Sequence, residues 1–192
     1  MGRRAAAFAR VANVTRATFD RLPPPSDRTI AMPSDDSADV IDRAAGLAPG
    51  DPLHSARRFR AKVVEATEAS HEALLRQPVE GLSTADRLCV ALHVCTIAGA
   101  RTLARHYEGQ LAEASGGDAP SSPALPAMLQ FAAALTTDPR RGDRAAIDSL
   151  RRAGLGDAAI VALAQLVAFV SYQLRVVAGL RAMRASPADV AP

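Results

Sequence analysis

The sequence predicts an all-helical protein, and three observations carry that prediction. The 192 residues are 48% hydrophobic and 22% charged, as is ordinary for a globular domain with a sizeable core. Aromatic residues make up 4% and Trp is absent, so the core must be built mainly from Ala, Leu, Val and Ile, which favours packed helices. No segment sustains the alternation of apolar and polar residues that strands require.

The first helix signals follow one another between residues 39 and 78. A short helix over 39–45 is expected to end at Gly46, and Asp51-Pro52 begins another. Apolar and small residues then recur every three or four positions from 53 to 76, which predicts a long amphipathic helix that Pro78 stops. The positions of this stripe, expected to face the core, are Phe59, Val63, Ala66, Ser70, Ala73 and Leu74.

The remaining helices are bounded by equally local signals. The run 83–86, Ser-Thr-Ala-Asp, starts a helix, Gly99 marks a break or a close contact, and a further helix runs to about residue 114. Beyond a Gly, Ser and Pro loop, helices are expected over 123–135, from Asp143 to Gly154, and from 155 to about 183. The last contains an apolar run at 158–174 that Gln165 and Gln173 interrupt, which indicates a buried core helix rather than a membrane span.

The chain divides by composition into three parts. Residues 1–35 hold a Pro run and scattered Arg, which predicts a disordered leader or an upstream extension of the reading frame, with Met32 as the true start. A transit peptide is the less favoured alternative. Residues 36–185 form the helical domain, and residues 186–192 form a flexible tail.

The position of the charges argues against nucleic acid as a partner. The pI is about 9.4, but residues 1–31 carry six arginines and two acidic groups. Residues 32–192 therefore carry 17 basic and 18 acidic groups. A nucleic-acid-binding domain needs a basic folded surface, so we expect no nucleic-acid partner and, from the helix signals above, no membrane partner.

The two cysteines, Cys89 and Cys95, lie six positions apart in one apolar helical run. Six residues carry two side chains to different faces of a helix, too far apart for a disulfide. No secretory segment precedes them, so we expect a cytoplasmic protein. No His-x-x-x-His or Cys-x-x-Cys spacing occurs, and we expect neither a metal site nor a cofactor.

Residues 82–111 carry a resemblance to a known superfamily. They read LSTADRLCVALHVCTIAGARTLARHYEGQL. This segment resembles the helix pair of the carboxymuconolactone decarboxylase and alkylhydroperoxidase D-like (AhpD-like) superfamily, in which a Glu precedes Cys-x-x-Cys-x-x-x-His. Residues 131–139 and 150–169, followed by Arg175, are similar to the stretch after those helices. The resemblance spans roughly residues 50–183 and implies an all-α, AhpD-like fold that forms homodimers, trimers or hexamers through helix packing.

The same alignment places the superfamily's reactive groups on residues that lack their chemistry. Anchoring on His106 puts Arg87 at the Glu position, Gly99 at the first Cys and Thr102 at the second. Dithiol peroxidase chemistry needs a reactive thiolate and a second, resolving thiol, and Arg cannot act as a general base. The sequence thus argues against dithiol alkylhydroperoxidase activity.

Three hypotheses for function follow. The first is a small-molecule enzyme of decarboxylase or lactone type, in which His106 moves a proton and an Arg, Arg175 or Arg101, holds a substrate carboxylate. Glu68 is a candidate to replace the missing relay carboxylate. The second is a thiol-dependent hydroperoxidase with a lone cysteine, Cys95 or Cys89. The third is a non-catalytic binding or assembly module.

Overall fold

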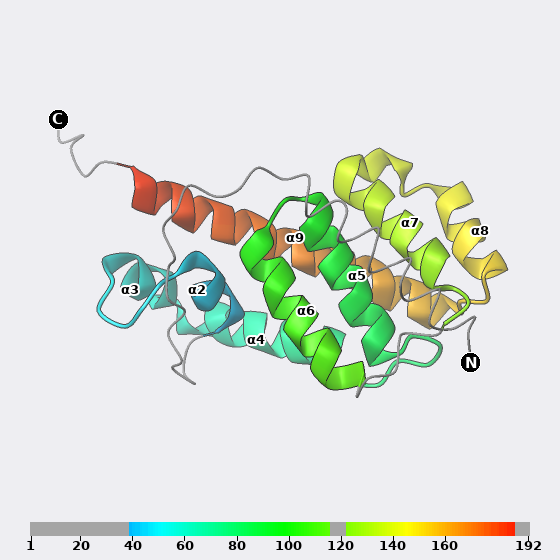
Figure 1. The fold of residues 1–192 in the computed structure, drawn as a ribbon, viewed down its shortest axis with the longest axis horizontal. Coiled ribbons are helices and arrows are strands. Elements are labelled where there is room, and N and C mark those ends of the chain that lie inside the picture. The colour runs from blue at the N-terminus through cyan, green and yellow to red at the C-terminus, as the bar shows by residue number, and fades with distance from the viewer. Residues whose placement is uncertain (1–38, 116–121, 187–192) are drawn as a thin grey trace.

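The computed structural model describes residues 39–115 and 122–186, and these residues form a helical fold (Figure 1). The β-structure among these residues is limited to an isolated bridge between Val79 and Leu82. The elements are α2 (Val40–Ala45), α3 (Pro52–Arg58), α4 (Ala61–Leu75), α5 (Thr84–Ile97), α6 (Arg101–Ser115), α7 (Leu125–Thr137), the 3-10 turn η1 (Pro139–Arg141), α8 (Arg144–Arg152) and α9 (Asp157–Ala185).

The all-helical prediction is confirmed for this part of the chain. The predicted leader, 1–35, and all of the predicted tail except Ser186 lie outside the described residues, as does Met32.

Three helix starts follow predicted capping signals, at Asp51, Ser83 and Asp143, and Asp39 caps α2 in the same way. Each N-cap side chain accepts a hydrogen bond from a backbone N–H that the first helical turn leaves without a partner. These caps are Asp39 to Asp42 N (2.7 Å), Asp51 to Leu53 N (2.8 Å), Ser83 to Asp86 N (3.1 Å) and Asp143 to Ala146 N (3.0 Å).

The predicted helix over 53–76 is wrong in two respects. The chain leaves helical geometry at Arg60, with φ −103° and ψ 81°, so α3 and α4 are separate helices. The predicted core stripe also faces outward, since Phe59 is 87% exposed and Val63 is 49% exposed. The residues of α4 that face the core are Thr67, His71 and Leu75.

Gly99 separates α5 from α6, as predicted. Its φ of 69° is left-handed, a conformation that costs a side-chain-bearing residue about 1–2 kcal/mol. The N–H of Ala100 donates to the carbonyl of Cys95 (2.9 Å), which closes the turn, and α6 folds back to pack along α5 (Figure 1).

The 29-residue helix α9 runs through the middle of the fold and packs against α2, α4, α5, α7 and α8. It is long and apolar enough to cross a membrane by length and composition, a test that core helices also pass. Its inner side, which includes Leu163, Leu166 and Val170, is buried in the protein core, as the sequence predicts.

One buried hydrogen bond fixes how α6 lies on α9. The hydroxyl of Tyr107 donates to Oε1 of Gln173 at 2.5 Å, and these residues are 0% and 1% exposed. A buried amide oxygen without its donor bears the full cost of desolvation, so this pair favours one rotation of α6 about its axis.

We predict that Tyr107→Phe lowers the free energy of unfolding by about 1–3 kcal/mol, because it leaves the Gln173 oxygen buried without a donor. Urea unfolding followed by circular dichroism measures this change. Tyr172→Phe is the matched control: Tyr172 is 39% exposed, so its loss should stay within about 0.5 kcal/mol. Equal losses in the two variants would contradict the role given to the buried pair.

Candidate functional site

Two histidines from different helices meet beside the core. His71 of α4 and His106 of α6 have ring centroids 6.2 Å apart and planes inclined at 47°. The Nε2 atom of each ring is buried and has no hydrogen-bond partner among the described residues. Because nearly all buried polar atoms in proteins are paired, two unpaired nitrogens at one place mark a candidate site for a ligand.

Aromatic rings enclose this pair on two sides. His71 lies 6.3 Å from the ring of Phe169 on α9, and His106 lies 5.2 Å from that of Tyr107, centroid to centroid. The imidazoles therefore sit at the junction of α4, α6 and α9, and Tyr107, next to His106, is bonded to Gln173 of α9.

Burial and nearby cations keep both imidazoles neutral near pH 7. Burial, His71, Arg43 and Arg76 together lower the pKa of His106 from 6.5 to about 4. Burial, followed by the charge of Arg76, also lowers the pKa of His71, and Arg43 contributes there too. A neutral imidazole offers one N–H donor and one lone pair, so the pair can both give and accept a proton.

Glu68, the predicted replacement for the relay carboxylate, has no hydrogen bond or ion pair with His106 among the described residues. Burial, followed by the carboxylate of Asp39, raises its pKa, while Arg57 and Arg43 act in the opposite direction. The residue as a whole is exposed, although neighbouring protein partly desolvates its carboxyl group.

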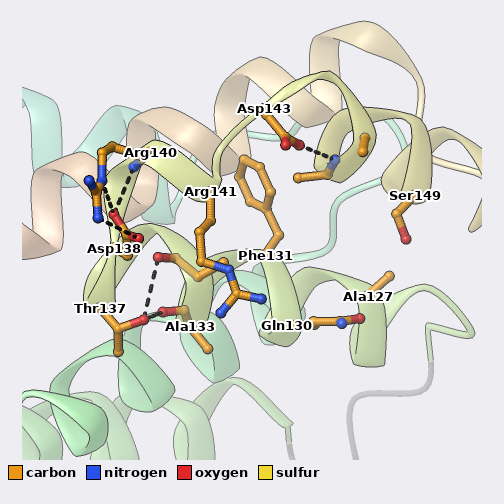
Figure 2. Close-up of a pocket in the computed structure, with 13 residues that line it drawn as sticks. Ala127, Gln130, Phe131, Ala133, Thr137, Asp138, Arg140, Arg141, Asp143 and Ser149 are labelled. Atoms are coloured by element: carbon orange, nitrogen blue, oxygen red, sulfur yellow. Dashed lines mark hydrogen bonds and ion pairs between the residues drawn. The ribbon is translucent and has the colours of Figure 1, made fainter.

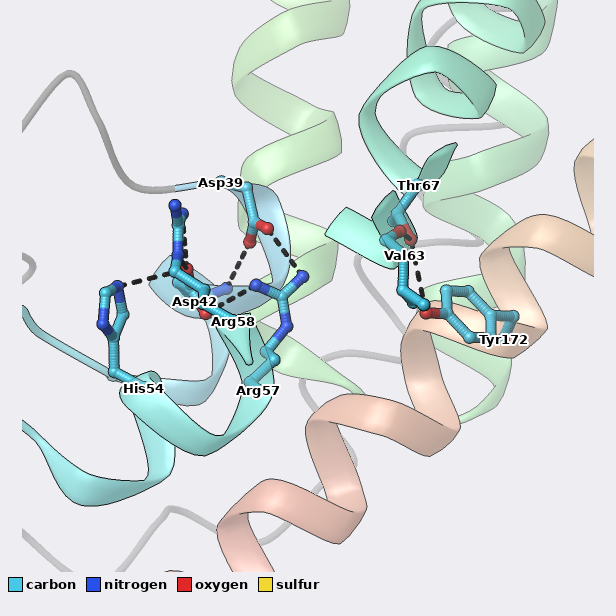
Figure 3. Close-up of polar contacts among 8 residues, drawn as sticks. All are labelled: Asp39, Asp42, His54, Arg57, Arg58, Val63, Thr67 and Tyr172. Atoms are coloured by element: carbon cyan, nitrogen blue, oxygen red, sulfur yellow. Dashed lines mark hydrogen bonds and ion pairs between the residues drawn. The ribbon is translucent and has the colours of Figure 1, made fainter. Parts of the chain in front are cut away.

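The charges of α2 and α3 form one cluster (Figure 3). The fully buried carboxylate of Asp42 lies 2.8 Å from Nη1 of Arg57, 2.8 Å from Nη2 of Arg58 and 3.6 Å from Nε2 of His54. Asp39 Oδ2 lies 2.6 Å from Nη2 of Arg57, an ion pair whose angles are not those of a hydrogen bond. The cluster fastens α2 to α3.

Arg175, predicted to hold a substrate carboxylate, is exposed on α9. Its Nη1 donates to the carbonyl of Ser171 on the same helix, at 3.4 Å. Arg175 has no hydrogen bond or ion pair with His106 among the described residues. Arg43 and Arg76 are the cations whose charges act on both histidines.

The cysteines are free thiols in the core. Cys95 is 0% exposed and Cys89 is 5% exposed, and burial raises the pKa of each to about 12. Both therefore remain protonated near pH 7, where a nucleophilic cysteine has to be a thiolate.

The positions that the resemblance assigns to the superfamily's relay and dithiol have structural roles. Arg87 is 1% exposed and donates to the carbonyl of Leu74 (2.9 Å) and to Oγ1 of Thr84 (3.0 Å). Gly99 makes the left-handed turn, and Thr102 Oγ1 accepts a hydrogen bond from Nη2 of Arg181 (3.0 Å). In the parts of the chain described here, no three potential metal ligands come together.

Sequence reasoning missed the roles of His71 and Arg43. The predicted core stripe of this helix does not include His71. Thr67, His71 and Leu75 lie at four-residue steps, and this spacing could have indicated a buried face. The other face of the helix is more apolar, so the sequence favoured that face as the buried one. Nothing in the sequence indicated Arg43, because its place depends on how α2 packs.

Comparison with known proteins agrees with this architecture. No protein-family model and no curated protein matches the sequence. The solved structure of an uncharacterized peroxidase-related protein from Silicibacter sp. TM1040 superposes with a TM-score of 0.51 and 21% identity, over 83% of this chain and 91% of that one. The chain has the fold of a peroxidase-related protein.

A second solved structure has a lower score. It is an alkylhydroperoxidase AhpD core, an uncharacterized peroxidase-related protein from Ralstonia eutropha JMP134, with a TM-score of 0.47 and 23% identity over 72% of this chain and 78% of that one. The likeness in fold therefore rests on the Silicibacter structure. At these identities the likeness extends to the fold alone.

The depressed pKa of His106 predicts a pH-dependent stability. The unfolded chain takes up this proton near pH 6.5 and the folded chain near pH 4, so the free energy of unfolding should fall as pH drops from 6.5 to 4. Urea unfolding over this range measures the slope, which His106→Gln should reduce. NMR titration of the His106 ring would contradict this account if its midpoint lay near 6.5.

Proposed function

We propose that this chain is a small-molecule enzyme in which His106, assisted by His71, moves a proton on a carboxylated substrate. The observation that carries the proposal is the pair of buried, unpartnered Nε2 atoms. The reaction class is decarboxylation or opening of a carboxylated lactone, since both need a proton acceptor or donor beside an anionic substrate.

The electrostatics of the site support an anionic substrate. The charges of Arg43 and Arg76 disfavour a proton on His106, and a bound carboxylate would offset them. Its arrival would raise the pKa of His106 from about 4 toward neutrality and let the ring take up a proton. In a decarboxylation, the C–C bond breaks, carbon dioxide leaves, and the resulting enolate carbon receives a proton from the imidazolium, which returns to the neutral imidazole.

The two alternatives have less support. A hydroperoxidase with a lone cysteine would need Cys95 or Cys89 as a thiolate, which their burial opposes. A non-catalytic module is compatible with the fold but leaves the paired histidines without a role. An enzyme therefore accounts for more of the described geometry.

We predict that His106→Gln lowers kcat by about 10²- to 10⁴-fold, the range typical for loss of a general acid or base. The assay follows carbon dioxide release and deuterium incorporation by NMR in D₂O across a panel of β-keto acids and carboxylated lactones. His71→Gln should also lower kcat, by a smaller factor.

Three further variants separate the hypotheses. Arg175→Gln and Glu68→Gln should leave kcat within about twofold, because neither side chain is bonded to His106. The double variant Cys89→Ser, Cys95→Ser should retain the decarboxylase or lactonase activity. Peroxide consumption lost in the double variant would favour the hydroperoxidase instead. Full turnover in His106→Gln, or no turnover of the whole panel by the wild type, would remove the proposed enzyme.

We also propose that the chain self-associates as a dimer, trimer or hexamer through the outward face of α4 and α9. Val63 of α4 is exposed there, and Phe59, the C-cap of α3, is also exposed. Thr67 connects Val63 to α9, since its hydroxyl bonds to the carbonyl of Val63 (2.8 Å) and lies 3.4 Å from that of Tyr172 (Figure 3). An apolar face that meets its own copy satisfies the symmetry of a closed oligomer.

We predict that Val63→Glu lowers the oligomer mass to that of a monomer, because it places a charge in an apolar interface. Size-exclusion chromatography with light scattering measures the mass. Met183→Glu is the matched control, since Met183 is also exposed, at 61%, but lies near the far end of α9. A wild type that is already a monomer would refute self-association.

The remaining proposals concern the cellular compartment and the binding partners. We propose a cytoplasmic protein without nucleic-acid or membrane partners. The free thiols support a reducing compartment, and the near balance of charge over residues 32–192 gives no basic surface for nucleic acid.

A further inference from the structure

A cavity of about 810 Å³ opens between α7, η1 and α8 (Figure 2). Its apolar lining includes the buried ring of Phe131 and small alanine side chains. The histidine pair is elsewhere, because α5 packs between α6 and α7 (Figure 1). The volume is within the range of small-molecule sites, roughly 300–1,000 Å³.

Three of the four charged residues that line the cavity already have partners. Arg140 donates from Nε to Oδ1 of Asp138 (2.9 Å) and from Nη2 to Oδ2 (3.2 Å), so these two charges neutralise each other. Asp143 accepts from the N–H of Ala146 (3.0 Å) as the N-cap of α8, and the helix dipole offsets its charge.

Arg141 is the fourth charged residue, and its guanidinium has no hydrogen bond or ion pair with any described residue. It acts on Asp138 through space. Its side chain runs from the turn toward Gln130 and Ala133, beside the ring of Phe131 (Figure 2). The side chains of Gln130 and Ser149 also line the cavity without a hydrogen-bond partner in the described parts of the chain.

The turn that carries Arg141 is held against α7. The N–H of Arg141 donates to the carbonyl of Asp138 (3.0 Å), and that of Gly142 donates to the carbonyl of Pro139 (3.1 Å). A Cβ on Gly142 would lie 2.4 Å from Cδ2 of Leu135, so the absence of a side chain permits this close approach. The backbone beneath the guanidinium is thereby positioned before any ligand arrives.

We propose that this cavity binds a small carboxylate with an apolar body, with Arg141 as its anion anchor. A planar carboxylate can accept two parallel N–H bonds from one guanidinium, while the apolar body covers Phe131 and the alanines. The single uncompensated cation favours a monoanion over a doubly charged phosphate. Gln130 and Ser149 supply further hydrogen bonds that orient the ligand.

Benzoate is the probe for this proposal, and ¹H–¹⁵N NMR of the full chain is the readout. In the wild type, benzoate should shift the amide signals of residues around the cavity, such as Phe131 and Ser149. Arg141→Gln should weaken its affinity at least tenfold. Arg140→Gln is the matched control, because that adjacent guanidinium is engaged by Asp138, and its affinity should stay within about threefold of the wild type.

Two ligand controls and one spectrum complete the test. Benzamide, which has the same ring without the charge, should bind at least tenfold more weakly than benzoate, and inorganic phosphate should not compete with it. The uncomplexed spectrum of Arg141→Gln should match that of the wild type away from the turn, which shows that the fold is intact. Wild-type binding weaker than about 10 mM, or equal affinity in Arg141→Gln, would overturn the proposal. Because His106 takes no part, the result is independent of the proposed enzyme.

Discussion

The hydrogen bond between Tyr107 and Gln173 constrains the histidine pair more than any contact within that pair. His106 directly precedes Tyr107, so a rotation of α6 that broke the buried bond would also swing His106 away from α4. Neither imidazole has a hydrogen bond at Nε2 to hold its position. The position of the histidine pair is therefore set by a polar pair in the core and not by hydrogen bonds of the imidazoles' own Nε2 atoms.

A second constraint comes from the charge cluster of α2 and α3. Asp42 gathers Arg57 and Arg58 around a fully buried carboxylate, and breaking such a pair would leave an uncompensated buried charge. This cluster fixes α2, which carries Arg43, and Arg43 in turn depresses the pKa of His106. The protonation state of His106 is thus set partly by α2 and α3, which supply no group to the proposed proton transfer.

The features that the sequence predicts correctly are helix ends, which a few neighbouring residues determine. The cap at Ser83 and the left-handed break at Gly99 depend on a few adjacent residues, and both are found where expected. The orientation of α4 is different, because both of its faces carry residues that can be buried. Tertiary packing selects the face with His71 and leaves Val63 exposed. The candidate site could be predicted at His106 but not at its partner, which comes from another helix.

Arg87 occupies the position that the resemblance gives to a relay carboxylate, and it also holds the helix that carries His71. By resemblance this position would carry a relay carboxylate, yet here its guanidinium is buried and donates to the carbonyl of Leu74. Leu74 lies three residues beyond His71 on α4, so the same side chain that removes the relay anchors the helix that supplies the second imidazole. Restoring Glu at position 87 would therefore not recreate a relay; it would leave the Leu74 carbonyl without its donor and loosen α4 from α5. The Leu74 carbonyl thus depends on a guanidinium at position 87, and a carboxylate there is incompatible with the packing of α4 that brings His71 beside His106.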